Sequence, residues 1–193
     1  MADRNTITSR ERVRLALSHQ EPDRVPIDLG GFQTGIHKQA YQDLIDYLGF
    51  DETIHTLDPV QQLAIPSERV LELFNVDIRY VTADSPDSYG GGIAKNARDG
   101  KLWHDLQDEF GVVWSMPDDQ MLYMDISHHP LANATVADLD RYPWPDGSDP
   151  SRFRGVRERA MAIREHTPYA LSSGICGVTY EYCWYMRGLE RWF

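Results

Sequence analysis

The chain has 193 residues, enough to bury a hydrophobic core, and its 41% hydrophobic residues are typical of a globular protein. Its 19 Lys and Arg against 30 Asp and Glu give a net charge of -11, which argues against nucleic acid and an anionic membrane as main partners. No stretch is apolar over the length of a membrane span, the first residues lack the apolar core of a signal peptide, and two cysteines are too few for a disulfide framework. We therefore expect a cytoplasmic protein.

The amino-terminal part of the chain predicts two helices. Thr8, followed three residues later by Glu11, forms a capping-box pattern that predicts a surface helix directly after it. Residues 36–48 carry apolar side chains at helical spacing, and Gly49 follows them where a glycine commonly ends a helix.

Between these helices, residues 25–29 predict a short buried strand that ends at Gly30 and Gly31. Asp28 and Gly30 would face one side of this strand and the apolar residues the other. A carboxylate on a strand otherwise suited to burial indicates a ligand site, and the glycines indicate a turn or a close approach of the backbone to a ligand. The alternative is a solvated aspartate on an edge strand.

A second strand is predicted over residues 76–81, after a loop over residues 50–65 and a helix over residues 67–74. Asp77 and Arg79 alternate with apolar residues along this strand. The apolar face would pack against helices, and the charged face would border a polar cavity. The alternative is an internal ion pair between Asp77 and Arg79 that has no chemical role.

Short β-prone runs at residues 102–106, 110–114 and 122–126, separated by turn residues, predict an antiparallel β elaboration over about residues 85–130, inserted between strand–helix units. The glycine run at residues 90–92 indicates a lid or a plain loop, because no Lys-Ser or Lys-Thr follows it as in a phosphate-binding loop. His128 and His129 are adjacent and no third ligand follows at a useful spacing, which argues against a metal site there.

The carboxyl-terminal part predicts helices at residues 135–141 and 151–166, a third strand at residues 169–175 and a final helix. Tyr180 and Glu181 follow a glycine turn after this strand, where the loops of barrel enzymes carry functional residues. For Glu181 the alternative is purely structural, because the helix dipole also favours a glutamate in a first helical turn.

Several segments together resemble the uroporphyrinogen decarboxylase-like superfamily, which also contains corrinoid-dependent methyltransferases. The segments are RERVRLALSHQEPDRVPIDLGG, LFNVDIRYV, DEFGVVW, HHPLANATVADLDRYPWPD and GICGVTYEYCWYMRGLERWF. The resemblance implies an α/β fold, a (β/α)8 TIM barrel with its active site at the carboxyl ends of the strands. Because such a barrel takes about 250 residues, it also implies that residues 1–193 are the amino-terminal part of one barrel domain, incomplete at its carboxyl end.

The resemblance also implies roles for individual residues. Asp77 resembles the aspartate with which the decarboxylases stabilise a protonated intermediate, and residues 174–177 resemble their glycine turn. The decarboxylases carry arginines after the first strand that grip the substrate carboxylates, whereas this chain reads DLGGFQTGIHKQAY there and has no arginine. This departure favours the methyltransferase branch.

We therefore expect a methyltransferase that demethylates a small substrate, using zinc and a corrinoid carried by a partner protein. The residues expected to act are Asp77 and Glu181 as catalytic groups, with Asp28, Gly30, Gly31, Arg79 and Tyr180 binding the substrate. The zinc ligands of such relatives usually lie in the carboxyl-terminal half, so we assign none here.

One alternative is a uroporphyrinogen decarboxylase of porphyrin biosynthesis, a lyase without a cofactor. The other is an inactive half-barrel that forms a homodimer or binds a partner through exposed strand edges.

Overall fold

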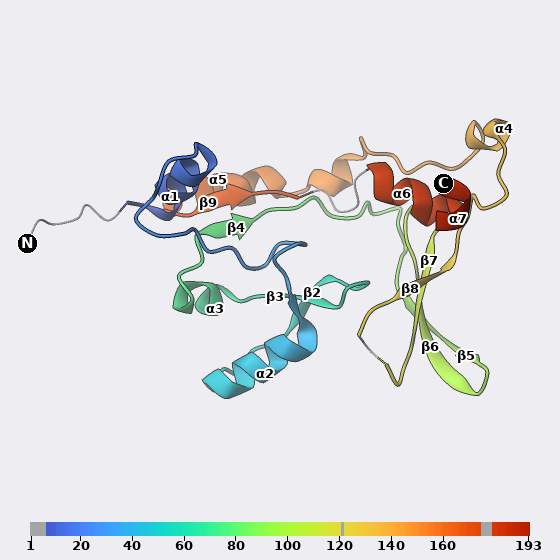
Figure 1. Ribbon diagram of the computed structural model, residues 1–193, viewed down its shortest axis with the longest axis horizontal. Helices are drawn as coiled ribbons and strands as arrows, with labels where there is room; N and C mark the ends of the chain where they lie inside the picture. The colour runs from blue at the N-terminus through green and yellow to red at the C-terminus, as the bar shows by residue number, and fades with distance from the viewer. Residues whose placement is uncertain (1–6, 121, 175–178) are drawn as a thin grey trace, which may run out of the picture. The chain divides into compact units, whose positions relative to one another are not determined.

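The computed structural model describes residues 7–120, 122–174 and 179–193. The described residues form a mixed α/β fold with three separate sheets and no closed barrel (Figure 1). They divide into two compact units. The first unit contains residues 1–58, 63–83 and 153–174, and the second contains residues 59–62, 84–152 and 175–193. The expectation of a single domain stays a prediction.

Two helices of the first unit lie where the sequence predicts them, and each has the predicted residue at its start or end. Helix α1 (Ser9–Leu17) begins with the predicted capping box, in which the Thr8 hydroxyl accepts from the Glu11 N–H and the Glu11 carboxylate accepts from the Thr8 N–H at 2.8 Å. Helix α2 (Lys38–Leu48) ends at Gly49, whose φ of +66° lies in the left-handed region that glycine adopts without strain.

A small antiparallel sheet packs against α2 and corrects the prediction of a loop over residues 50–65. Its order is β1 (Ile36–His37), β3 (Leu63–Ile65) and β2 (His55–Asp58). These strands are too short to show a period of two in the sequence, and the pairing of β2 with β3 is irregular between Thr56 and Asp58. The core beneath them consists of Tyr41, Ile45, Ala64 and Val70.

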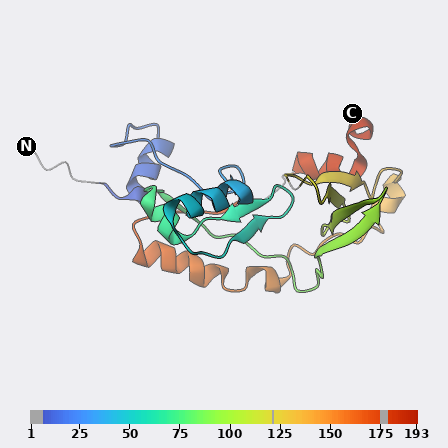
Figure 2. The ribbon, with the colours of Figure 1, turned by 90° about the horizontal axis from the view of Figure 1, so that it is seen from below.

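The parallel strand pair of the first unit is central to the functional site. Strand β4 (Ile78–Tyr80) pairs in parallel with β9 (Ala170–Ser172), so both carboxyl ends lie at the same edge. In chain order, helix α3 (Glu68–Leu73) precedes β4, and helix α5 (Val156–His166), which is orange in Figure 2, precedes β9. Both strands were predicted, although each is shorter than its apolar run.

The predicted strand over residues 25–29 is wrong. Ile27 O accepts from the Asp77 N–H at 2.8 Å, but the Ile27 N–H donates to a carboxylate oxygen of Asp77 rather than to a backbone carbonyl. The Asp77 carboxylate thus accepts the Ile27 N–H, which in a β-strand would donate to a carbonyl of the neighbouring strand. The segment stays outside any strand, with Val25 80% exposed.

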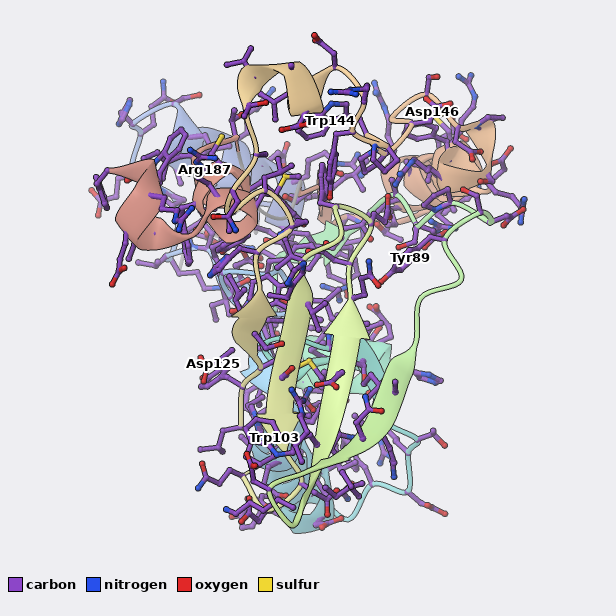
Figure 3. All side chains as sticks on the ribbon, turned by 90° about the vertical axis from the view of Figure 1, so that its right-hand side faces the viewer. Tyr89, Trp103, Asp125, Trp144, Asp146 and Arg187 are labelled. Atoms are coloured by element: carbon purple, nitrogen blue, oxygen red, sulfur yellow. The ribbon has the colours of Figure 1, made fainter. Side chains whose placement is uncertain are left out.

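The second unit is built on a four-stranded antiparallel sheet within the region where the antiparallel elaboration was predicted. The strands follow one another in space in the order β5 (Ile93–Arg98), β6 (Lys101–Gln107), β7 (Val113–Pro117) and β8 (Asp125–His128). Figure 3 shows this sheet, with Trp103 on β6 and Asp125 on β8. Two small cores support the second unit, one around Leu106, Met116 and Met124 and the other around Val112, Leu131 and Met186.

The remaining helices are short. They are α4 (Val136–Leu139), α6 (Thr179–Arg187), α7 (Leu189–Trp192) and the 3-10 helix η1 (Pro150–Phe153). The single helix predicted over residues 151–166 is in fact η1 followed by α5, because Gly155, at φ +69°, interrupts the helical backbone. Residues 175–177 of the glycine turn predicted over residues 174–177 lie outside the described residues. None of the helices in the described ranges is long and apolar enough to cross a membrane.

Candidate functional site

A polar cluster lies at the carboxyl ends of the two parallel strands. Tyr80, the last residue of β4, donates its hydroxyl hydrogen to a carboxylate oxygen of Asp28 at 2.7 Å. The same hydroxyl also contacts the side chains of Thr34 and Ser172, and Ser172 is the last residue of β9. We call Asp28, Gly31, Thr34, Tyr80 and Ser172 the Asp28–Tyr80 site.

Asp28 has one oxygen that the protein does not satisfy. Its Oδ2 accepts from Tyr80, whereas its Oδ1 is buried and has no hydrogen-bond partner among the described residues. A buried carboxylate oxygen without a donor is costly. This oxygen is therefore the atom of the site that most needs a donor from water or from a ligand.

Gly31 lies close to Tyr80, and the ligand-binding role expected for Gly30 and Gly31 stays a prediction. A Cβ atom on Gly31 would lie 2.6 Å from both the Cζ and the hydroxyl oxygen of Tyr80. Gly30 has a φ of +104°, which side chains other than glycine rarely tolerate. Gly31 thus allows the tyrosine ring to lie against the backbone near Asp28, and Gly30 supplies the left-handed backbone before it.

The Tyr80 phenol stays protonated and acts as a hydrogen-bond donor. Burial raises the pKa of Tyr80, the neighbouring Asp28 carboxylate raises it further, and the hydrogen bonds with Thr34 and Ser172 lower it by less. A neutral phenol beside a carboxylate can hold a proton at a fixed position next to a bound substrate.

Asp77 lies at the centre of a buried ion-pair network. Its side chain has no exposed surface, and it accepts from Arg12 Nη1 at 2.7 Å, from Arg24 at 2.7 and 2.9 Å, and from the Ile27 N–H. Arg12 also binds Asp23 at 2.6 Å. Burial alone would raise the pKa of Asp77, but the hydrogen bonds from Arg24, Ile27, Ser9 and Arg12 lower it below its ordinary value. Both carboxylate oxygens of Asp77 thus accept hydrogen bonds that hold segments of the first unit together.

Arg79 belongs to a different ion pair. Its guanidinium forms a bidentate ion pair with Glu68, in which Nη2 lies 2.6 Å from one carboxylate oxygen and Nε lies 2.9 Å from the other. The guanidinium also lies over the ring of Tyr169, 3.6 Å from its centroid. The sequence left open an ion pair between Asp77 and Arg79, but each of them pairs with residues of other elements instead.

Tyr180 and Glu181 belong to the second unit, whereas the other predicted site residues belong to the first. Both are exposed in the first turn of α6. Tyr180 packs edge to face against Trp192, with ring centroids 5.9 Å apart. The catalytic role expected for Glu181 stays a prediction, as does that of Asp77.

The described residues do not fit a zinc ion. Among residues 7–120, 122–174 and 179–193, no three His, Cys, Asp or Glu side chains gather closely enough to hold a metal. His129, from the adjacent histidine pair, bonds through Nδ1 to the Tyr185 carbonyl at 2.6 Å. We therefore assign no zinc ligand to this part of the chain.

The sequence indicated Asp28 and Gly31 as site residues but not Tyr80, which contacts both of them. It placed Tyr80 on the apolar face of its strand because the ring is hydrophobic. A tyrosine at the carboxyl end of a strand has a polar end that needs a partner when buried, and this signal could have identified it. The arginine partners of Asp77 are distant in sequence and carry no such signal.

Comparison of the chain with protein families, curated proteins and solved structures finds no match.

Proposed function

We propose that the chain forms part of a (β/α)8 barrel of the uroporphyrinogen decarboxylase-like superfamily and takes part in corrinoid-linked demethylation of a small substrate. One observation supports this most directly: the Asp28–Tyr80 site lies at the carboxyl ends of the parallel strands β4 and β9. Barrel enzymes place their active sites at that end of their strands. The sequence segments that resemble the superfamily supply the assignment of chemistry.

The parallel pairing of β4 and β9 agrees with a barrel of strand–helix units. Parallel strands need a long crossover connection, and helix α5 directly precedes β9. In the proposed barrel, the antiparallel sheet of the second unit is an elaboration within the connection between these two strands.

The pairing of arginines with carboxylates of the protein itself favours demethylation over porphyrinogen decarboxylation. A substrate with many carboxylates needs free cationic groups to hold it. Of the described arginines around β4, Arg12 and Arg24 are held by the fully buried Asp77, which leaves at most Arg79, too few cations for a substrate with many carboxylates. The Asp28–Tyr80 site itself presents a carboxylate and a phenol, which suit a polar or cationic group better than an anion.

In this proposal Asp28 binds the polar group of the methylated substrate through Oδ1, and Tyr80 fixes the carboxylate through Oδ2. Loss of a methyl group leaves the substrate heteroatom with the bonding electron pair, and this atom then takes a proton, which Tyr80 and Asp28 are placed to hold. A corrinoid would supply the methyl acceptor. No step is assigned to zinc, because the described residues offer no ligand set for it.

The test is methyl transfer to cob(I)alamin by the purified protein, followed by the absorbance of methylcobalamin. The donors are protonated trimethylamine and methanol, which can each donate a hydrogen bond to Asp28 Oδ1, and methoxybenzene, which cannot, each with and without added zinc. We expect one of the first two donors to be demethylated. Formation of coproporphyrinogen from uroporphyrinogen would instead favour the decarboxylase. Failure of both reactions, with a stable dimer in light scattering, would favour the partner-binding alternative.

A further inference from the structure

A pocket of about 310 Å³ lies beside β4 in the first unit. Its wall is mostly apolar, with side chains from α3, α5 and the segment before α3, and it includes Leu71, Ile163, Ile65 and Pro66. Its volume is at the lower end of the range for small-molecule sites, about 300–1,000 Å³. A pocket of this size and lining suits a compact ligand with an apolar body.

One buried cation borders this apolar pocket. The Arg79 side chain is 8% exposed, and its Nη1 is held by the carbonyl oxygens of Val76 and Ile78 at 2.9 and 3.0 Å. Its position is fixed further by the ring of Tyr169. An arginine keeps its charge in any surroundings, so a guanidinium buried this deeply must have an anionic partner.

The present anionic partner is easily displaced. The Glu68 side chain is 54% exposed and is the only side-chain carboxylate paired with Arg79 among the described residues. A half-exposed glutamate gains little from the pair, because water solvates its carboxylate almost as well. Its carboxylate occupies the fork formed by Nε and Nη2, and any other carboxylate would bind this fork with the same geometry.

We propose that this pocket binds a small monocarboxylate with an apolar body, whose carboxylate replaces that of Glu68 on Arg79 while the body fills the apolar wall. The exchange conserves charge, since one carboxylate leaves the guanidinium as another arrives. Glu68 thereby acts as a built-in competitor that weakens binding. The pocket adjoins the Asp28–Tyr80 site through Gly30 and Tyr80, but the inference concerns binding alone and does not depend on methyl transfer.

The experiment measures the binding of benzoate by isothermal titration calorimetry to the chain and to its Glu68→Ala variant. Removing the competitor should tighten benzoate binding about two- to fivefold, as expected when a partly exposed ion pair that gains little no longer has to be broken. Benzamide, which has the same shape without the charge, should show no gain. The matched control is Glu72→Ala, which removes an exposed glutamate from the same helix.

Equal affinities of benzoate and benzamide, or no gain in a Glu68→Ala variant with the circular dichroism of the parent, would overturn the proposal. Arg79→Met should abolish benzoate binding. If that variant does not fold, the comparison of Glu68→Ala with Glu72→Ala still decides, because both keep Arg79 in place.

Discussion

At the scale of single residues, Asp77, directly before strand β4, and Tyr80, the last residue of that strand, have different roles. Asp77 has no exposed surface and joins Arg12 and Arg24 into one network, which ties α1 and the segment after it to β4. Tyr80, three residues later, holds Asp28 at the strand end. The stability of the first unit and the chemistry of its site therefore depend on different side chains.

Asp77→Ala should destabilise the first unit strongly. The change leaves Arg12 buried without its inner partner, and breaking a buried ion pair from one side typically costs about 3–5 kcal/mol. Urea unfolding followed by circular dichroism measures the loss, with the exposed Asp51→Ala as control. A variant as stable as the parent would show that the network contributes nothing and would return Asp77 to the candidates for catalysis.

The same network makes the stability of the first unit depend on pH. The pKa of Asp77 in the folded chain lies below its ordinary value of 3.8, because the hydrogen bonds of its arginine and backbone donors outweigh the effect of burial. The unfolded chain then binds a proton more readily, so the stabilisation is complete above pH 3.8 and is lost as the pH falls through the folded value. Urea midpoints should drop at acid pH in the parent and drop less in Asp77→Asn.

Tyr80→Phe should lower demethylation while leaving the fold intact. It removes one hydroxyl group that fixes Asp28, and the loss of a positioned proton-holding group typically reduces rates about 100-fold or more. Gly31→Ala should have a similar effect, because its Cβ would displace the Tyr80 hydroxyl. Rates with cob(I)alamin measure both, with Tyr47→Phe, an 87% exposed tyrosine on α2, as the control. Unchanged rates in both variants would exclude the Asp28–Tyr80 site from catalysis.

At the scale of elements, helices α1 and α2 of the first unit follow local signals, whereas its parallel strands β4 and β9 depend on partners distant in sequence. The capping box fixes the start of α1, and the left-handed glycine fixes the end of α2. Strands β4 and β9 are each only three residues long, and their residues pair across about ninety positions of sequence. Their length is set by where the partner strand ends, not by their own apolar runs.

Gly49→Ala tests the end of α2. A Cβ at this position would meet no other atom within 4 Å, so the only cost is the left-handed backbone, about 1 kcal/mol. Urea unfolding by circular dichroism measures this loss. Gly174→Ala is the control in the same unit, since a Cβ there makes only an ordinary contact of 3.6 Å with Phe32 and φ is not positive. Equal losses in the two variants would contradict the assignment to backbone conformation.

At the scale of the whole molecule, the chain passes repeatedly between two units that have separate cores. The core of the first unit is centred on Tyr41 and Ile45, and those of the second on Met116 and Val112. All five tryptophans belong to the second unit. Tryptophan fluorescence therefore reports on the second unit, while circular dichroism reports on both.

Ile45→Ala should separate the unfolding of the two units. Ile45 is 1% exposed, and truncating such a residue to alanine costs about 2–5 kcal/mol. We expect the circular dichroism transition to begin at lower urea while the tryptophan fluorescence transition stays in place. Val112→Ala, in the second unit, should shift the fluorescence transition instead. Coincident shifts in both variants would mean that the two units unfold as one.

The sequence by itself determined the features that depend on neighbours in the chain. It located α1 and the end of α2 through Thr8, Glu11 and Gly49, and it indicated the region of strands β6, β7 and β8 through short β-prone runs, whereas β5 formed in a stretch expected to be a loop. It also identified Asp28, Gly30 and Gly31 as unusual in their setting. These signals are readable because capping, turn formation and left-handed backbone conformations are properties of a few adjacent residues.

Only the tertiary structure decided which polar groups meet. Asp28 lies 52 residues from Tyr80, Asp77 lies 65 residues from Arg12, and neither distance leaves a period or a motif in the sequence. Another long-range contact keeps residues 25–29 out of a strand, because the Ile27 N–H donates to the Asp77 carboxylate instead of to a strand carbonyl. A charged side chain is satisfied by whichever partner the fold brings within hydrogen-bond distance, so its role as an ion pair or as part of a site is fixed only when the chain has folded.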